Sequence, residues 1–228
     1  MEVFKYSNKG SRNENQDYIS YKVLSHSATI FVITDGMGGY SNGDIAAKIV
    51  ADSIVDFTDS NLDKMTPAQL LKEAVAFSND SLMLKRLALG AQKMGCVVAV
   101  LLLIGSDAYM TWLGDSRIYL YRNEREVYRT EDHSIINELS KIKTLNAESY
   151  QKYASIVTRS VMGDDKLGIV EVSHAVVETG DIFVLTTDGF YKEISMDLAM
   201  RYDGGHQGLL DKKAPNISDN FSFIKVKL

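Results

Sequence analysis

The first third of the chain contains two short apolar runs followed by two stretches of helical periodicity. Residues 18–23 and 28–33 are rich in β-branched and aromatic side chains, which predicts two strands. Apolar residues then recur at helical spacing over 45–57 and again over 70–82. This spacing predicts two amphipathic helices, each with one face turned toward a core.

Both predicted helices are preceded by polar residues that can start a helix. The pair Ser41-Asn42 lies before the first. Before the second, Thr66 can cap the helix, Pro67 suits its first turn and Gln69 completes a capping box. The start of the second helix is therefore the better defined of the two.

Strand patterns resume in the middle of the chain. Residues 97–104, 108–113, 118–122 and 126–129 are predicted strands, and short turns join them. Strands that follow one another so closely are typical of antiparallel pairing. We therefore expect these four segments to form an antiparallel meander.

The last third mixes both kinds of element. Residues 135–139 and 147–162 are predicted to be helical, whereas 170–177, 181–186 and 221–227 are predicted strands. The order along the chain is therefore strands, two helices, strands, a helical insertion and strands. This order predicts an α+β fold in which helices cover antiparallel sheets.

Composition indicates a globular chain. It has 228 residues, 45% of them apolar and 24% charged, and no stretch resembling a linker, so we expect a single domain over 1–228. The formal net charge is −5, and the basic residues of 122–129 alternate with glutamates. This distribution argues against a nucleic-acid partner.

Other features bear on the compartment. Cys96 is the one cysteine, which excludes an internal disulfide, and the first residues lack the apolar core of a signal peptide. The longest apolar run, 96–104, is about half of the ~20 residues that a membrane-spanning helix needs. We expect a cytoplasmic protein without a membrane partner.

Two segments repeat one pattern. Residues 31–36 and 184–189 are apolar strands that each end in Asp-Gly. Asp-Gly is a common turn dipeptide, so a purely structural interpretation is available for either one. The repetition weakens that interpretation, because an unpaired carboxylate at the mouth of a buried sheet is costly unless a cation balances it.

Three further aspartates lie at comparable positions. Asp17 precedes the strand predicted over 18–23, Asp115 lies in a turn between two strands and Asp219 precedes the last strand. Five carboxylates at strand ends indicate a common rim, and an all-oxygen ligand set selects Mg²⁺ or Mn²⁺. The histidines have no zinc-like spacing and are expected to be turn or surface residues: His26, His133, His174 and His206.

Six motifs together resemble one family. They stand in the order and approximate spacing of the metal-dependent protein phosphatases, the protein phosphatase 2C family, in its compact bacterial form. The motifs are Arg12 to Asp17, Asp35 to Gly39, Gly114 to Arg117, Asp132 to Ser134, Thr187 to Gly189, and Asp219-Asn220. The resemblance implies a four-layer α-β-β-α sandwich, with two stacked antiparallel sheets and a two-metal centre between them at one end.

The resemblance also implies a set of metal ligands. Asp35 would bridge two Mg²⁺ or Mn²⁺ ions and the Gly36 carbonyl would complete one site, while Asp188 and Asp219 would hold the other ion. Asp17 would act behind these ligands or through a water on a metal. These roles belong to the family and are carried over residue by residue.

Further roles follow from the same resemblance. Asp115 would hold a weaker third ion together with Asp188, and Arg12 would grip the substrate phosphate with its forked guanidinium. Met37 stands where many eukaryotic members have a histidine. The proton for the leaving group must therefore come from water or from another group.

The implied function is hydrolysis of phosphoserine and phosphothreonine in proteins by a water that two metal ions activate. The expected partners are phosphorylated proteins, with a bacterial Ser/Thr kinase as the opposing enzyme, and the expected state is a monomer. Two alternatives stay open. One is a pseudophosphatase that binds phosphoproteins without turnover, which the complete set of metal positions disfavours. The other is a phosphatase of small metabolites, for which no second basic cluster is evident.

Overall fold

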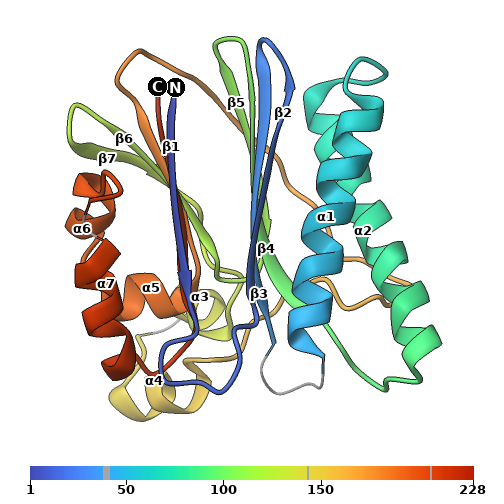
Figure 1. The fold of residues 1–228 in the computed structure, drawn as a ribbon. Coiled ribbons are helices and arrows are strands. Elements are labelled where there is room, and N and C mark those ends of the chain that lie inside the picture. The colour runs from blue at the N-terminus through green and yellow to red at the C-terminus, as the bar shows by residue number, and fades with distance from the viewer. Residues whose placement is uncertain (38–41, 143, 206) are drawn as a thin grey trace.

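Two five-stranded antiparallel sheets form the centre of the molecule (Figure 1). The computed structural model describes residues 1–37, 42–142, 144–205 and 207–228. The first sheet has the order β1 (Glu2–Asn8), β10 (Phe221–Lys227), β9 (Ile182–Thr186), β6 (Arg117–Arg122), β7 (Arg125–Arg129). The second has the order β2 (Asp17–Ser25), β3 (Ala28–Gly36), β4 (Cys96–Ile104), β5 (Asp107–Leu113), β8 (Ser173–Val176).

Helices cover the outer face of each sheet, and this confirms the four-layer α+β sandwich. The second sheet is covered by α1 (Gly43–Asn61) and α2 (Pro67–Leu89). The first is covered by α5 (Asp188–Glu193), α6 (Met196–Arg201) and α7 (Gln207–Lys213), followed by a 3₁₀ turn, Ala214–Asn216. Two short helices, α3 (Ile135–Ser140) and α4 (Ala147–Tyr153), lie at the lower end in Figure 1.

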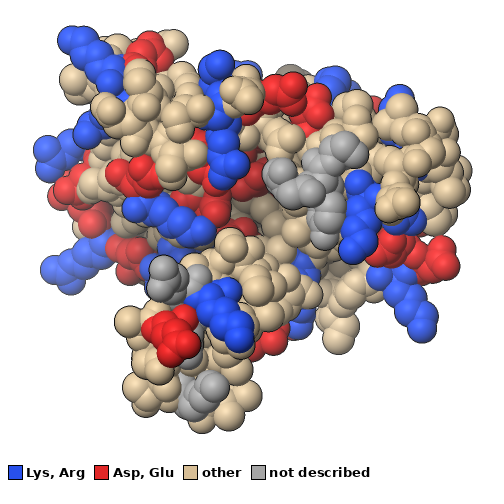
Figure 2. Space-filling view, turned by 90° about the horizontal axis from the view of Figure 1, so that it is seen from below, with Lys and Arg blue, Asp and Glu red and all other residues tan. Residues whose placement is uncertain are grey.

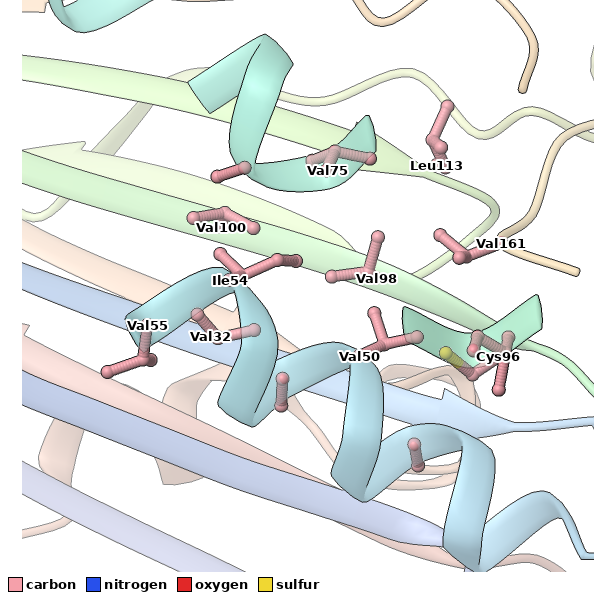
Figure 3. Packing of buried hydrophobic residues seen from close by; sticks show 14 of the residues in the cluster. Val32, Val50, Ile54, Val55, Val75, Cys96, Val98, Val100, Leu113 and Val161 are labelled. Atoms are coloured by element: carbon pink, nitrogen blue, oxygen red, sulfur yellow. The ribbon is translucent and has the colours of Figure 1, made fainter. Parts of the chain in front are cut away.

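The central strands read as continuous apolar runs because both of their faces are buried. In β3, Ile30 and Val32 face α1 and α2, whereas Phe31 and Ile33 face the other sheet. Figure 3 shows Val32 of the sheet packed near Ile54 of α1. Alternate residues therefore belong to different cores, one between sheet and helices and one between the sheets.

The expected start of the second helix is confirmed. Thr66 accepts a hydrogen bond from the Gln69 N–H at 3.4 Å, and Pro67 is the first helical residue. Asn42 precedes α1 in a left-handed conformation without a side-chain cap. Ser41, like Gly38, Gly39 and His206, lies outside the described residues. Across the ranges given above, we find no helix that combines the length and the apolar character needed to cross a bilayer.

The predicted single meander over 97–129 is wrong. β4 and β5 pair in the second sheet, but β6 and β7 belong to the first, where β6 pairs with β9. The chain crosses between the sheets at Gly114, whose φ is 114°. A Cβ there would lie 2.2 Å from Val97 Cγ1, so the crossing requires glycine. Closeness along the chain does not reveal such a change of sheet.

The helix predicted over 147–162 is also too long. Helical structure ends at Tyr153, and beyond it isolated antiparallel bridges join Val157 to Ser134 and Val161 to Cys96. Val161 exchanges two backbone hydrogen bonds with Cys96, of 2.9 and 3.0 Å. These bonds replace the helical ones, and apolar spacing alone cannot distinguish the two outcomes. The strand predicted over 170–177 is also too long, because only β8 (Ser173–Val176) is a strand in this segment.

Candidate metal centre

The five aspartates that the sequence singles out lie at one edge shared by both sheets, the lower end in Figure 1. Asp17 begins β2 opposite Asp35 near the end of β3, and Asp115 follows β5. Asp188 follows β9 and Asp219 precedes β10. Antiparallel pairing puts the end of one strand beside the start of its neighbour, so carboxylates distant in sequence converge. Seen from this end, acidic side chains gather around a hollow (Figure 2).

A pocket of about 750 Å³ opens at this edge. Four of the five aspartates line it, together with Gly36, Met37 and the predicted phosphate ligand Arg12. Its lining comprises Arg12, Asn13, Glu14, Gln16, Asp35, Gly36, Met37, Val97, Asp115, Ser155, Val157, Asp188, Asp219 and Asn220. The structure therefore brings four of the five predicted aspartates to one cavity.

Asp17 lies behind the pocket, with only 6% of its surface exposed. Its Oδ2 accepts a hydrogen bond from Thr187 Oγ1 at 2.9 Å. Its Oδ1 is buried and has no partner among the described residues. A buried carboxylate oxygen without a donor is costly, and a cation near the neighbouring Asp35 would offset that cost. This orphaned oxygen fits the implied metal centre.

The carboxylates also disturb one another electrostatically. Burial, followed by the charges of Asp17, Asp188, Asp115 and Asp219, raises the pKa of Asp35 well above its usual range. Burial and the charges of Asp188 and Asp219 raise the pKa of Asp17 to about 7. Burial and Asp188 raise the pKa of Asp115 to about 6. Such a cluster holds its protons unless positive charge is supplied.

These shifts predict how pH affects the metal-free protein. The folded-state pKa values of Asp17 and Asp115 exceed the ordinary value of about 3.9, so their contribution to stability is complete below that value. It is lost as pH rises through about 6 to 7. We expect the Tm in EDTA to fall by several °C between pH 5.5 and pH 8, at roughly 2–4 °C per kcal/mol. Calorimetry measures this, and a Tm that rises over the same interval would contradict it. Added Mn²⁺ should reduce the difference.

Two basic side chains already contact the cluster. Arg12, 54% exposed, donates from Nη2 to Asp219 Oδ2 at 3.0 Å and from Nε to the Ser218 carbonyl at 3.1 Å. Lys192 Nζ lies 2.6 Å from Asp188 Oδ2. In the described part of the chain, no three Asp, Glu, His or Cys side chains already form a metal-ligand group. The carboxylates would have to draw closer together around an ion.

The glycines of both Asp-Gly pairs are required by close packing. A Cβ on Gly36 would lie 2.3 Å from the Gly43 carbonyl oxygen at the start of α1. A Cβ on Gly189 would lie 2.1 Å from the Asn220 carbonyl oxygen. Neither glycine has a positive φ, so the simple turn interpretation does not apply. The missing side chains let backbone segments meet directly behind the carboxylates.

This packing makes Gly189→Ala a sensitive change. Because a methyl group would push α5 away from the segment that carries Asp219, we expect unfolding stability to fall by about 1–3 kcal/mol. Mn²⁺ should bind more weakly as well. Gly208→Ala in α7 is a matched control, since a Cβ there would have nothing within 4 Å and alanine favours helix. Urea unfolding with and without Mn²⁺ measures both effects. An unchanged midpoint in Gly189→Ala would refute the packing argument.

Sequence reasoning missed residues that hold the centre together. Asn220 Oδ1 accepts the Gln16 N–H at 2.8 Å, and its Nδ2 donates to the carbonyls of Lys9 and Glu14 at 2.9 and 2.8 Å. It thereby ties the segment before Asp17 to β10. The Asp219-Asn220 motif marked this residue but did not indicate its role.

A second set of contacts connects two of the quoted motifs to Tyr191 of α5. Arg117 makes a bidentate ion pair with Asp132, at 2.8 and 2.7 Å. Its guanidinium stacks 3.6 Å from the ring centroid of Tyr191, whose hydroxyl donates to the Asp115 carbonyl at 3.1 Å. These contacts fix the Asp115 turn relative to α5. The ion pair between Asp188 and Lys192 was also missed, although the i, i+4 spacing of these residues in the sequence was a signal for it.

His133 and His174 have local roles. His133 Nδ1 accepts the Gly114 N–H at 3.3 Å, and its ring stacks on Trp112. Its pKa is lowered by burial and by the charge of Arg159. His174 pairs with Asp107 at the opposite end of β5. Cys96 is a buried free thiol.

Comparison with known proteins places this geometry in a family. Residues 6–213 match the family model described as protein phosphatase 2C. Protein phosphatase PhpP of Streptococcus pneumoniae is 30% identical over 200 residues, which cover 86% of this chain and 81% of the relative.

Solved structures show the same fold. A serine/threonine phosphatase of S. agalactiae superposes with a TM-score of 0.81 at 24% identity, covering 100% of this chain and 99% of that one. The catalytic domain of the phosphatase PstP, in complex with 2 manganese ions, superposes with a TM-score of 0.78 at 20% identity, covering 98% and 96%. The family match, the relative and the shared architecture agree with the six motifs. The chain belongs to the protein phosphatase 2C family of phosphoprotein phosphatases.

Proposed function

We propose that this chain hydrolyses phosphoserine and phosphothreonine in proteins, with two Mg²⁺ or Mn²⁺ ions held at the shared edge of the two sheets. The observation that carries the proposal is the convergence of Asp17, Asp35, Asp115, Asp188 and Asp219, which raises the pKa of Asp35. Relatives named as protein phosphatases, such as PhpP, support the substrate class.

The proposed ligands follow from the residues at the pocket. Asp35, the Gly36 carbonyl, Asp188 and Asp219 would hold the ions, with Asp17 behind them. The chemistry that two bound ions would supply is activation of a water for in-line attack at phosphorus and neutralisation of charge on the phosphoryl oxygens. Oxygen ligands of this kind suit both Mg²⁺ and Mn²⁺.

Arg12 and Met37 define the rest of the chemistry. Arg12 would exchange its contact with Asp219 for the phosphoryl oxygens, since a guanidinium binds such oxygens through two parallel hydrogen bonds. Met37 lines the pocket and carries no exchangeable proton. The leaving alkoxide would therefore take its proton from solvent.

Wider expectations belong to the same proposal. Residues 1–228 would act as one domain, which the pairing of β1 with β10 supports because it joins the two ends of the chain. The protein would work as a cytoplasmic monomer on phosphorylated proteins and oppose a bacterial Ser/Thr kinase. Neither nucleic acid nor membrane is proposed as a partner.

Metal removal tests the proposal. We expect purified protein to release phosphate from p-nitrophenyl phosphate and from a phosphothreonine peptide with Mn²⁺, and to lose this activity in EDTA. Absence of metal-dependent release would favour the pseudophosphatase. A higher kcat/KM on sugar or nucleotide phosphates than on phosphoproteins would favour a metabolite phosphatase instead.

A further inference from the structure

Lys192 brings a positive charge into the acidic cluster. It lies one helical turn after Asp188 in α5, with Nζ 2.6 Å from Asp188 Oδ2. The charges of Asp115 and Asp132 also act on this ammonium. Asp188 and Asp115 both line the pocket. The ammonium therefore belongs to the side of the centre that α5 and the Asp115 turn form.

This side of the centre is held firmly in place. The Tyr191 hydroxyl donates to the Asp115 carbonyl at 3.1 Å, and the Tyr191 ring stacks on Arg117 at 3.6 Å. Arg117 is itself fixed by two hydrogen bonds to Asp132. Lys192 follows Tyr191 directly, so its backbone position relative to Asp115 is set by the same contacts. An isolated i, i+4 pair on a helix surface has no such fixed neighbour.

Charge balance indicates what the ammonium does. Two divalent ions and one ammonium match the charge of five carboxylates. Because a carboxylate has two oxygens, the contact through Asp188 Oδ2 leaves Oδ1 available to an ion on the Asp35 side. Arg12 then need not neutralise the cluster and is available to a phosphate.

We propose that Lys192 is a built-in cation of the centre, whose ammonium occupies the Asp115–Asp188 side and restricts the chain to two divalent ions. The inference rests on the proposed two-metal function and deepens it. It replaces the weaker third ion that the family resemblance implied between Asp115 and Asp188. Lys192 is thus a positioning residue that determines the number of ions bound.

Counting bound Mn²⁺ by equilibrium dialysis tests the inference without reference to activity. We expect two ions per chain in the wild type and three in Lys192→Met, which keeps the apolar stem and removes the charge. The additional ion should bind at least about tenfold more tightly than any third ion in the wild type. Lys192→Arg should bind two ions. Lys85→Met, an exposed lysine in α2, is the matched control and should also bind two.

A second readout comes from thermal unfolding. The rise in Tm from EDTA to saturating Mn²⁺ should be larger in Lys192→Met than in the wild type, because one more ion stabilises the folded state. Lys192→Gln should give the same count and the same larger rise, so a folding defect in one variant does not decide the outcome.

Either of two results would overturn the inference. One is the same number of bound Mn²⁺ ions in the wild type, Lys192→Met and Lys192→Gln, and the other is three bound ions in the wild type. Failure of the proposed function would look different, because a chain without phosphatase activity would still show the difference in Mn²⁺ count between wild type and Lys192→Met.

Discussion

Replacing Asp35 by Asn is expected to lower kcat at least about 10³-fold with Mn²⁺ present. An amide supplies neither the negative charge nor the second acceptor oxygen that a ligand shared by two ions needs. Four other aspartates raise the pKa of Asp35, so this position lies at the electrostatic centre of the cluster. The substitution therefore acts where positive charge is most strongly attracted.

The same substitution should have the opposite effect on the metal-free protein. In the metal-free cluster the Asp35 carboxyl must either hold a proton above its ordinary pKa or ionise among four other aspartates, and Asn avoids both costs. The substitution should therefore raise the Tm in EDTA at neutral pH, while the further rise on adding Mn²⁺ should shrink. Asp107→Asn is a suitable control, because Asp107 begins β5 at the opposite end of the same sheet. It should leave kcat and Mn²⁺ dependence unaltered. Wild-type kcat in Asp35→Asn would show that the assignment of the centre is wrong.

The second large effect concerns Arg12. We expect Arg12→Ala to lower kcat/KM by about 10- to 150-fold, which corresponds to the roughly 1.5–3 kcal/mol of a charge-assisted hydrogen bond to phosphate. The loss should appear mainly in KM if ground state and transition state are held equally. Inorganic phosphate should also inhibit the variant less strongly. Arg12→Lys should recover only part of the loss, because an ammonium cannot form the bidentate fork.

The contact between Arg12 and Asp219 adds a distinguishing feature. Because Asp219 loses a competing basic partner, Mn²⁺ should bind Arg12→Ala as tightly as the wild type or more tightly. Arg125→Ala, an exposed arginine at the start of β7, is the control and should change neither constant. Unchanged kcat/KM together with unchanged phosphate inhibition in Arg12→Ala would show that Arg12 does not bind the phosphate and has only a structural role.

Local patterns predicted most of the elements because burial leaves a strong signal. β3 and β4 read as apolar runs since both faces are covered, and α1 and α2 show one apolar stripe each. β1 was missed, because of its seven residues only Tyr6 is buried, and its place in the sheet depends on β10 at the other end of the chain. An edge strand carries little local signal.

The candidate site was predictable to the extent that its residue types are unusual where they occur. Aspartates at the ends of strands as apolar as β3 and β9 require a balancing charge, and this requirement can be read without coordinates. The supporting contacts were not predictable. Asn220, Thr187 and Tyr191 act on groups far away in the sequence, and none of them differs in type from an ordinary turn or helix residue.

The sequence by itself determined that the protein is an α+β chain with five strand-end carboxylates, and from these it predicted an oxygen-rich centre for a hard cation. These properties depend on the chemistry and spacing of nearby residues. The tertiary structure decided which strands share a sheet and that the chain passes from one sheet to the other at Gly114. It also decided which basic side chain forms an ion pair with which aspartate. Sheet pairing and ion pairing join residues as distant as Arg12 and Asp219, and their geometry exists only once both sheets have packed.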